Sequence, residues 1–465
     1  MNSKPLSYDC WKSIISHVDP NKRLLLSLQS PAARSIEKTV PLKLDKLVFH
    51  DHRIEVDETV YECEIYQMDS CDEKPPYQVN GQNELNHRNI CDVDCFGIPD
   101  YITKAGGMLP GGRFQKNLFG ERDSENIESN GDRLEKLKQR LSVEKKRYNQ
   151  VIEFRPKNDV TETPETIEDN YQRFRTCTFI VSKRIYTNGE LEFLKNEDTW
   201  KLAIAFLKER IDRMEKRLLP FVNKEKNIRP NFEVHLIKKE GNSETVIKRV
   251  KYTGDFHNTI RSIWELMFSR RQSLVMKDFK FILEECPIPM PREQKMKTVA
   301  LLLAGKVTTS SMTSIIDLSS SPLKQLFLIL DSNEPGDVDH EFIRTSKYLT
   351  IFERSDKILP LILNLVHQTV EINLLMSNFL TNEDFVSLIR RWIETNKPVG
   401  TCFTFKDCGS EEEDIIQVIS FACEQIDGAI EVNKLLTIPM RNDKELQVRY
   451  QFKKKTVKMT VVSLS

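Results

Sequence analysis

The stretch LKQLFLIL, residues 323–330, carries the pattern that decides the expected fold. Leu323, Leu326 and Leu328 reproduce the spacing L-x-x-L-x-L, in which the side chains of a short strand stack into a shared interior. Similar short apolar stretches recur around it: FKFIL from residue 279, VALLL from 299, YLTIF from 348, VEINLL from 370 and GTCFTF from 400. With LKQLFL at 323 included, the six starts are 20, 24, 25, 22 and 30 residues apart.

These distances lie near the leucine-rich-repeat period of about 20 to 29 residues. We therefore expect residues 275–465 to form an irregular leucine-rich-repeat-like α/β domain. An ordinary α/β domain with a parallel sheet is the alternative, because the repeat asparagine is not evident. The stretch TNEDFVSLIRRWIETN predicts a helix capped at Thr381. ELQVRYQF and TVKMTVV predict a C-terminal hairpin suited to covering the end of a repeat stack.

The preceding segment, residues 126–274, is expected to hold helices and a hairpin. Residues 132–152 predict one helix, and residues 198–219 predict a second with a heptad seam. NFEVHLIKKEGNSETVIKRVKYTG then alternates about a Gly-Asn turn, as a hairpin does. The seam pairs either within the chain or with a second copy, and consists of Trp200, Ile204, Leu207, Ile211, Met214 and Leu218.

Residues 42–125 are expected to begin with strands, because apolar residues alternate from Leu42 to Gln67. Five glycines follow within fifteen residues, and we expect a mobile loop there. No Gly-Lys-Ser/Thr accompanies them, so a phosphate cradle is disfavoured. These glycines are Gly106, Gly107, Gly111, Gly112 and Gly120. The expected fold class is therefore α/β, with a mixed α+β N-terminal half.

The charge balance and the apolar content of the sequence limit which classes of partner are expected. The chain has 465 residues, of which 30% are charged, and its 69 basic residues balance 69 acidic ones. A net charge of zero gives no overall attraction to nucleic acid or to an anionic membrane. The longest apolar runs, VALLLAG and ILPLILNLV, are far shorter than a membrane span of about 20 residues, and no signal peptide is evident. We expect an intracellular protein, cytoplasmic or nuclear, without nucleic-acid or membrane partners.

Neither a metal site nor a catalytic site is expected. His87, Cys91 and Cys95 would make one half of a zinc site, but Cys63 and Cys71 are too far apart to supply the other half. We therefore expect free thiols and no cofactor. The eight histidines accompany no hydrolase, metalloprotease or nucleotide motif. The chain is not expected to be an enzyme, although a triad assembled only in three dimensions stays open.

Residues 1–41 predict three short helices, which begin near Ser7, Pro20 and Pro31. Trp11, Ile14, Ile15 and Val18 fall on one apolar stripe of the first. Three helices in about 35 residues bury too little surface to be stable alone, so they need a neighbour or a partner. A helical cap on the next domain is the simplest alternative.

The segment PLSYDCWKSIISHVDPNKRLLLSL resembles the F-box, with a leading Pro-Leu, an Ile-Ile-x-x-Val helix and a second leucine-rich helix. Together with GGMLPGGRF and SLIRRWIETNKPVGTCFTF, it is similar to a nematode-expanded family of uncharacterised proteins with an F-box-like start. The resemblance implies docking on the small adaptor subunit of a cullin-based ubiquitin ligase, with an unknown protein substrate bound elsewhere. The implied partner-binding residues are Pro5, Leu6, Ile14, Ile15 and Val18. The competing expectation is a scaffold or self-associating protein without a ligase connection.

Overall fold

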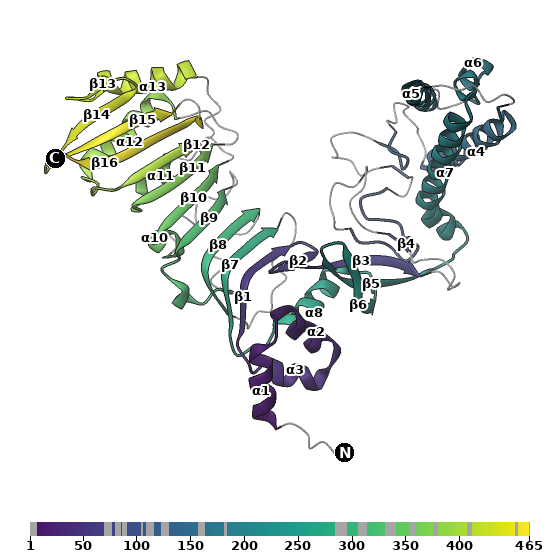
Figure 1. Cartoon of the computed structure of the whole chain (residues 1–465), viewed down its shortest axis with the longest axis horizontal. Helices are drawn as coiled ribbons and strands as arrows, with labels where there is room; N and C mark the ends of the chain where they lie inside the picture. Colours follow the sequence, from purple (N-terminus) through teal and green to yellow (C-terminus); the bar gives the residue numbers. More distant parts are fainter. Residues whose placement is uncertain are drawn as a thin grey trace. The chain divides into compact units, whose positions relative to one another are not determined.

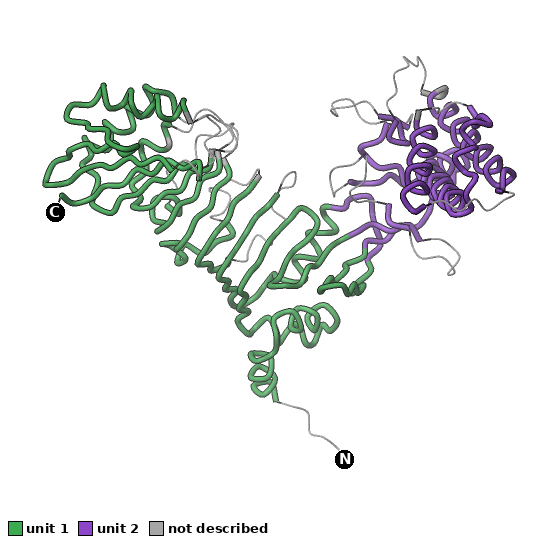
Figure 2. Tube along the Cα trace, turned by 45° about the horizontal axis from the view of Figure 1, so that its top comes forward, with its two compact units in different colours: residues 1–63, 235–249, 257–465 green, residues 64–234, 250–256 purple. Residues whose placement is uncertain are grey.

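The computed structural model divides the chain into two compact units (Figure 2). Unit 1 comprises residues 1–63, 235–249 and 257–465, and unit 2 comprises residues 64–234 and 250–256. The structure describes residues 7–68, 77–79, 85, 91–103, 106–107, 116–121, 130–156, 163–180, 184–283, 295–305, 314–330, 341–353, 359–374, 380–406, 412–451 and 454–464.

Unit 1 is built on one large mixed sheet, which confirms the expected α/β class (Figure 1). Its strands follow the order β13-β14-β15-β16-β12-β11-β10-β9-β8-β7-β1-β2-β3-β5-β6, and one further short strand, β4, pairs with β3 off this path. From β7 to β12 each strand lies parallel to the one before it in sequence. These strands are β7 (Leu274–Leu283), β8 (Met296–Gly305), β9 (Gln325–Leu330), β10 (Tyr348–Glu353), β11 (Thr369–Leu374) and β12 (Cys402–Lys406). All six strand predictions are confirmed.

Helices cover one face of these parallel strands (Figure 1). Strand residues of one parity, such as Leu326, Leu328 and Ile351, are buried on that side, because side chains alternate between the two faces of a strand. The Trp392 ring packs edge-on against Phe403 with 4.8 Å between centroids. The covering helices are α10 (Glu341–Thr345), α11 (Leu359–Asn364), α12 (Asn382–Glu394) and α13 (Glu412–Gln425), and a 3-10 turn η2 (Leu318–Ser320) precedes β9. The predicted helix at Thr381 is thus α12, with the Thr381 hydroxyl accepting from the Asp384 amide.

Antiparallel strands close the C-terminal end of the sheet. The predicted hairpin is confirmed as β15 and β16, and β16 also pairs antiparallel with β12. Two shorter strands continue the sheet beyond β15. The four strands are β13 (Ile430–Val432), β14 (Leu435–Met440), β15 (Lys444–Gln451) and β16 (Thr456–Ser463).

The N-terminal residues join the same sheet at its other side. β1 pairs parallel with β7, with Leu42 opposite Leu274, and antiparallel with β2. The sequence predicted strands from Leu42 to Gln67, but it did not predict that β1 pairs with β7. The elements are α1 (Tyr8–His17), α2 (Pro20–Gln29), α3 (Pro31–Glu37), β1 (Leu42–His50), β2 (Arg53–Val56), β3 (Thr59–Met68), the hairpin β5 (Asn231–Glu240) and β6 (Ser243–Lys251), and α8 (Phe256–Phe268).

Unit 2 is centred on three long helices. The predicted heptad helix is α7, and its seam faces α4 and α5 inside the unit: Leu207, Ile211, Met214 and Leu218 are at most 9% exposed. The seam is therefore occupied within the chain. The elements are β4 (Tyr77–Gln78), α4 (Asn130–Glu153), α5 (Pro164–Ile180), α6 (Asn188–Leu191), the 3-10 turn η1 (Glu192–Leu194) and α7 (Glu197–Glu225).

The described part of the glycine-rich segment packs against α4. Gly106 has a φ of +77°, and a Cβ atom there would lie 2.8 Å from the Leu137 side chain. The Leu118 amide donates to the Gly106 carbonyl at 2.7 Å, and Gly107 pairs with Asn117. These glycines therefore make a close approach to a helix. Gly111 and Gly112 lie outside the described residues.

Candidate functional site

Helix α1 carries an exposed apolar face. Tyr8, Trp11 and Ile14 are 49%, 40% and 44% exposed, and their spacing of three residues places them along one side of the helix. Ile15 is buried and Val18 is half-buried. The structure therefore divides the predicted docking residues: Ile14 faces outward, Ile15 faces the other helices, and Pro5 and Leu6 lie outside the described residues.

Tyr8 is the member of this face that the sequence analysis missed. It precedes Trp11 by three residues, so extending the helical stripe toward the N-terminus would have found it. The Tyr8 hydroxyl donates to Thr39 Oγ1 at 3.3 Å, and the Lys12 ammonium lies 4.5 Å from the centre of its ring. We call Tyr8, Trp11 and Ile14 the α1 face.

The rest of the helical segment is held to unit 1 by a buried ion-pair cluster. Glu37 Oε1 lies 3.0 Å from Arg23 Nη2 and 2.6 Å from Arg271 Nη1. Arg23 also donates to the Val40 carbonyl at 2.8 Å and to the Pro41 carbonyl at 2.9 Å. Because buried charges are stable only when paired and hydrogen-bonded, this cluster fixes α2 and α3 on the turn after α8.

Lys38 adds to the positive charge at this junction. Burial is the main cause that lowers the pKa of its ammonium to about 8, and the Arg271 guanidinium lowers it further. Its Nζ atom lies 3.5 Å from Ser269 Oγ. The junction thus holds α3 in place by both buried charge and direct hydrogen bonds, while α1 keeps its apolar face in solvent.

The second exposed surface of unit 1 is the sheet face opposite the covering helices. Leu302 of β8 lies opposite Phe327 of β9, and Ile329 lies opposite Phe352 of β10. All four side chains are half-buried. The centroids of the Phe327 and Phe352 rings are 4.5 Å apart. Neighbouring parallel strands therefore form a continuous, partly apolar surface.

Ser346 and His367 form a buried serine–histidine pair. Ser346 Oγ lies 3.2 Å from His367 Nε2, but each residue is only 5% exposed. Burial lowers the pKa of His367, and its Nδ1 atom has no hydrogen-bond partner among the described residues. A triad needs a carboxylate at that nitrogen and access for substrate. The pair forms a buried hydrogen bond between the residue after α10 and the segment before β11.

The sequence disfavoured a zinc site at His87, Cys91 and Cys95. In the described part of the chain, no three His, Cys, Asp or Glu side chains meet at metal-binding distances. Cys63 and Cys91 are buried, and Cys95 is exposed. His87 and Cys71 lie outside the described residues. Within the same described ranges, the helices are all too short or too polar to cross a bilayer.

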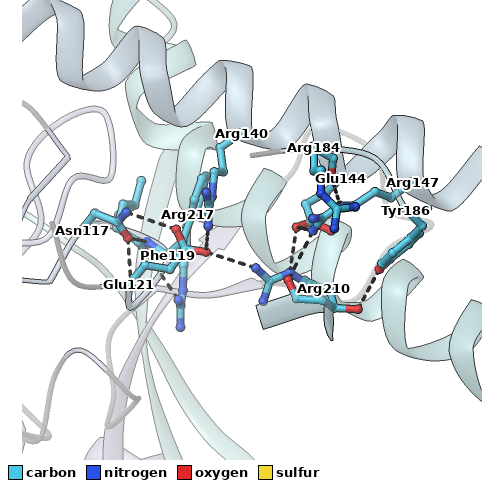
Figure 3. A network of polar contacts seen from close by, with 12 residues as sticks. Asn117, Phe119, Glu121, Arg140, Glu144, Arg147, Arg184, Tyr186, Arg210 and Arg217 are labelled. Atoms are coloured by element: carbon cyan, nitrogen blue, oxygen red, sulfur yellow. Dashed lines mark hydrogen bonds and ion pairs between the residues drawn. The ribbon is translucent and has the colours of Figure 1, made fainter. Parts of the chain in front are cut away.

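Unit 2 contains a network of arginines and glutamates between α4 and α7 (Figure 3). Glu144 and Arg147 are fully buried, and their ion pair measures 2.8 Å. Arg210 bridges two carboxylates, with its Nη2 atom 3.2 Å from Glu121 and its Nε atom 3.4 Å from Glu144. Arg140 pairs with the same Glu121 oxygen. The ion pairs of this network join α4 to α7.

A regular spacing of arginines in the sequence could have predicted this network. Arg133, Arg140 and Arg147 are seven residues apart on α4, as are Arg210 and Arg217 on α7. Seven residues are close to two helical turns, so each series lies along one side of its helix. Arginines repeated in this way on two neighbouring helices predict shared carboxylates between them.

The family comparison concerns unit 1. Residues 255–408 match a family described as a domain of unknown function (DUF3557), and this range runs from α8 to β12. The match covers less than half of the chain and is consistent with an uncharacterised family. Comparison with curated proteins and with solved structures gave no match.

Proposed function

We propose that the chain is an F-box-like protein-binding adapter that docks through α1 on the small adaptor subunit of a cullin-based ubiquitin ligase. The observation that carries the proposal is the α1 face, where Tyr8, Trp11 and Ile14 expose apolar surface together. An exposed group of large apolar side chains on an otherwise charge-rich protein needs a partner to cover it. A few such anchors supply most of the affinity of an interface.

The way in which α2 and α3 are anchored also supports this docking proposal. The Arg23–Glu37–Arg271 cluster holds α2 and α3 on unit 1, so α1 projects from a fixed base. A docking element on a fixed base loses less conformational freedom on binding than a loose one. The substrate would lie on the leucine-rich-repeat-like strands, whose open face carries Leu302, Phe327 and Phe352. Extended repeat surfaces of this kind suit protein partners.

The alternative function, a scaffold that associates through the heptad helix, is less well supported. Leu207 is fully buried, and Met214 and Leu218 are each 3% exposed within unit 2. A second copy could use this seam only after unit 2 opened. The seam therefore offers no ready surface for self-association.

The test is co-purification of the full chain with the ligase adaptor subunit. Trp11→Asp and Ile14→Asp place a charge on the α1 face at exposed positions, so folding is expected to survive. Val366→Asp is the matched control, because Val366 is 69% exposed and lies outside α1. We expect the wild type and the control to retain the adaptor and both α1 variants to lose it. A wild type that captures no adaptor, or α1 variants that capture it equally, would refute the proposal.

A further inference from the structure

Helices α5 and α7 of unit 2 present three aromatic side chains together. The Phe206 ring lies edge-to-face with Tyr171 and with Phe179, at centroid distances of 6.4 and 6.0 Å. Phe179 is 53% exposed, and Tyr171 and Phe206 are half-buried. Leu202, one helical turn before Phe206, is 40% exposed. An aromatic group of this kind is unusual on a surface that faces only water.

Two guanidinium groups lie on these rings. Arg175 sits 5.6 Å from the centre of Tyr171 and 5.4 Å from that of Phe206. Arg210 sits 5.1 Å from the centre of Phe179. Stacking on aromatic rings fixes a guanidinium in place while leaving its edge free to donate. We call Tyr171, Arg175, Phe179, Phe206 and Arg210 the aromatic–arginine patch.

The patch and the ion pairs that adjoin it through Arg210 together carry more positive than negative charge. Arg140, Arg147 and Arg210 share two carboxylates, those of Glu121 and Glu144 (Figure 3). Because three guanidinium groups share two carboxylates, one positive charge is not neutralised. Arg175 adds a second, because its one hydrogen bond in the described structure is a 3.5 Å contact with Gln172 Oε1 and its buried Nε atom has no partner.

We propose that the aromatic–arginine patch binds an acidic segment of another protein. A carboxylate of the segment pairs with Arg175, which has the geometry for two parallel hydrogen bonds. An apolar side chain of the segment packs on Phe179 and Phe206. Aromatic residues and arginine are the types enriched at the energetic centres of protein interfaces. The proposal does not depend on the ligase connection, because the patch belongs to unit 2 and α1 to unit 1.

The same residue types also occur in single-stranded nucleic-acid sites, where bases stack on open ring faces. Here the guanidinium of Arg175 or Arg210 already lies over each of the three rings. The rings also meet edge-to-face instead of forming a row of parallel platforms. The arrangement therefore favours a protein segment.

The experiment selects binders from a random-peptide phage library on the full-length chain and measures the enriched peptides by fluorescence polarisation. We expect enrichment of peptides that combine Asp or Glu with large apolar residues, and binding that weakens as salt rises. Arg175→Gln and Phe179→Ala should each weaken binding at least about tenfold, the effect of a hot-spot residue.

Arg173→Gln is the matched control. Arg173 lies on the same helix two residues from Arg175, but it is 61% exposed and pairs with Asp169. Its substitution should leave the affinity for the peptides unchanged. The proposal is overturned if no acidic peptide is enriched, if Arg173→Gln weakens binding as much as Arg175→Gln, or if a single-stranded oligonucleotide displaces the peptides and binds more tightly. An adaptor subunit that fails to co-purify would leave this result unaffected.

Discussion

Glu37 and Arg271 form an ion pair of 2.6 Å across 234 residues of sequence, and both side chains are at most 1% exposed. Glu37 ends α3, and Arg271 lies on the turn between α8 and β7. The Arg23 guanidinium approaches the same carboxylate oxygen from α2. One carboxylate therefore joins the N-terminal helices to the first strand of the parallel series.

Glu37→Gln is expected to destabilise unit 1 strongly. Removing the carboxylate leaves two buried guanidinium groups without their anion, which costs about 3–5 kcal/mol for buried pairs. The measurement is urea unfolding of the full chain. Asp45→Asn is the control, because the Asp45–Lys277 pair is equally short but about three-quarters exposed, and its loss should have little effect on stability. Equal losses for the two variants would contradict this account.

Local pattern predicted the strands and helices well because each depends on neighbouring residues. The six apolar stretches became β7 to β12, and the hairpin after residue 444 became β15 and β16. The heptad spacing predicted the buried side of α7 correctly. Period and polarity fix which side of an element is buried, and these are properties of the sequence itself.

Local sequence patterns do not predict which distant segments pair with one another. Residues 42–50 do not indicate that β1 lies beside β7. Leu42 pairs with Leu274, which is about 230 residues later in the sequence. The same limit applies to Ile14 and Ile15. Both fit the apolar stripe, but only Ile15 is buried, and that depends on how α1 packs in the fold. The arginine network needed two helices to be placed together before its shared carboxylates could be seen.

Acid should weaken unit 1 through Glu62. A hydrogen bond with His52 at 3.0 Å, helped by Lys239 at 2.9 Å, lowers the pKa of Glu62 to about 2 from its usual 4.5. A carboxyl with a lowered folded-state pKa stabilises the fold above its unfolded pKa and loses that contribution as pH falls. The loss is therefore expected between about pH 4.5 and pH 2.

Unfolding free energies measured across this range check the expectation. Glu62→Gln should be less stable at neutral pH and should lose less stability on acidification than the wild type does. Glu58→Gln is the control, because Glu58 lies exposed in the turn between β2 and β3 and should keep the wild-type slope. A Glu62→Gln chain with an unchanged acid slope would show that other groups control acid unfolding.

The heptad seam is expected to act as core. Leu207→Ala removes a fully buried side chain between α5 and α7 and should cost about 2–5 kcal/mol. Leu202→Ala, five residues earlier on the same helix but 40% exposed, should change stability by about 0.5 kcal/mol or less. Thermal unfolding of both variants, with sedimentation to follow their mass, separates core from interface. A mass that falls in either variant would instead place α7 in a contact between copies.

Gly106→Ala is expected to loosen the packing of the glycine-rich segment on α4. The new Cβ would lie 2.8 Å from Leu137 Cδ1, a buried side chain, and would hold alanine at a φ of +77°. The left-handed backbone costs about 1–2 kcal/mol and overpacking about 1–3 kcal/mol more. Gly189→Ala is the matched control, because it lies in α6 with nothing within 4 Å, and alanine there should stabilise the helix by about 0.5–1 kcal/mol. Hydrogen exchange should show faster exchange of the α4 amides in Gly106→Ala alone. Faster exchange in both variants, or in neither, would mean that Gly106 does not fix this contact.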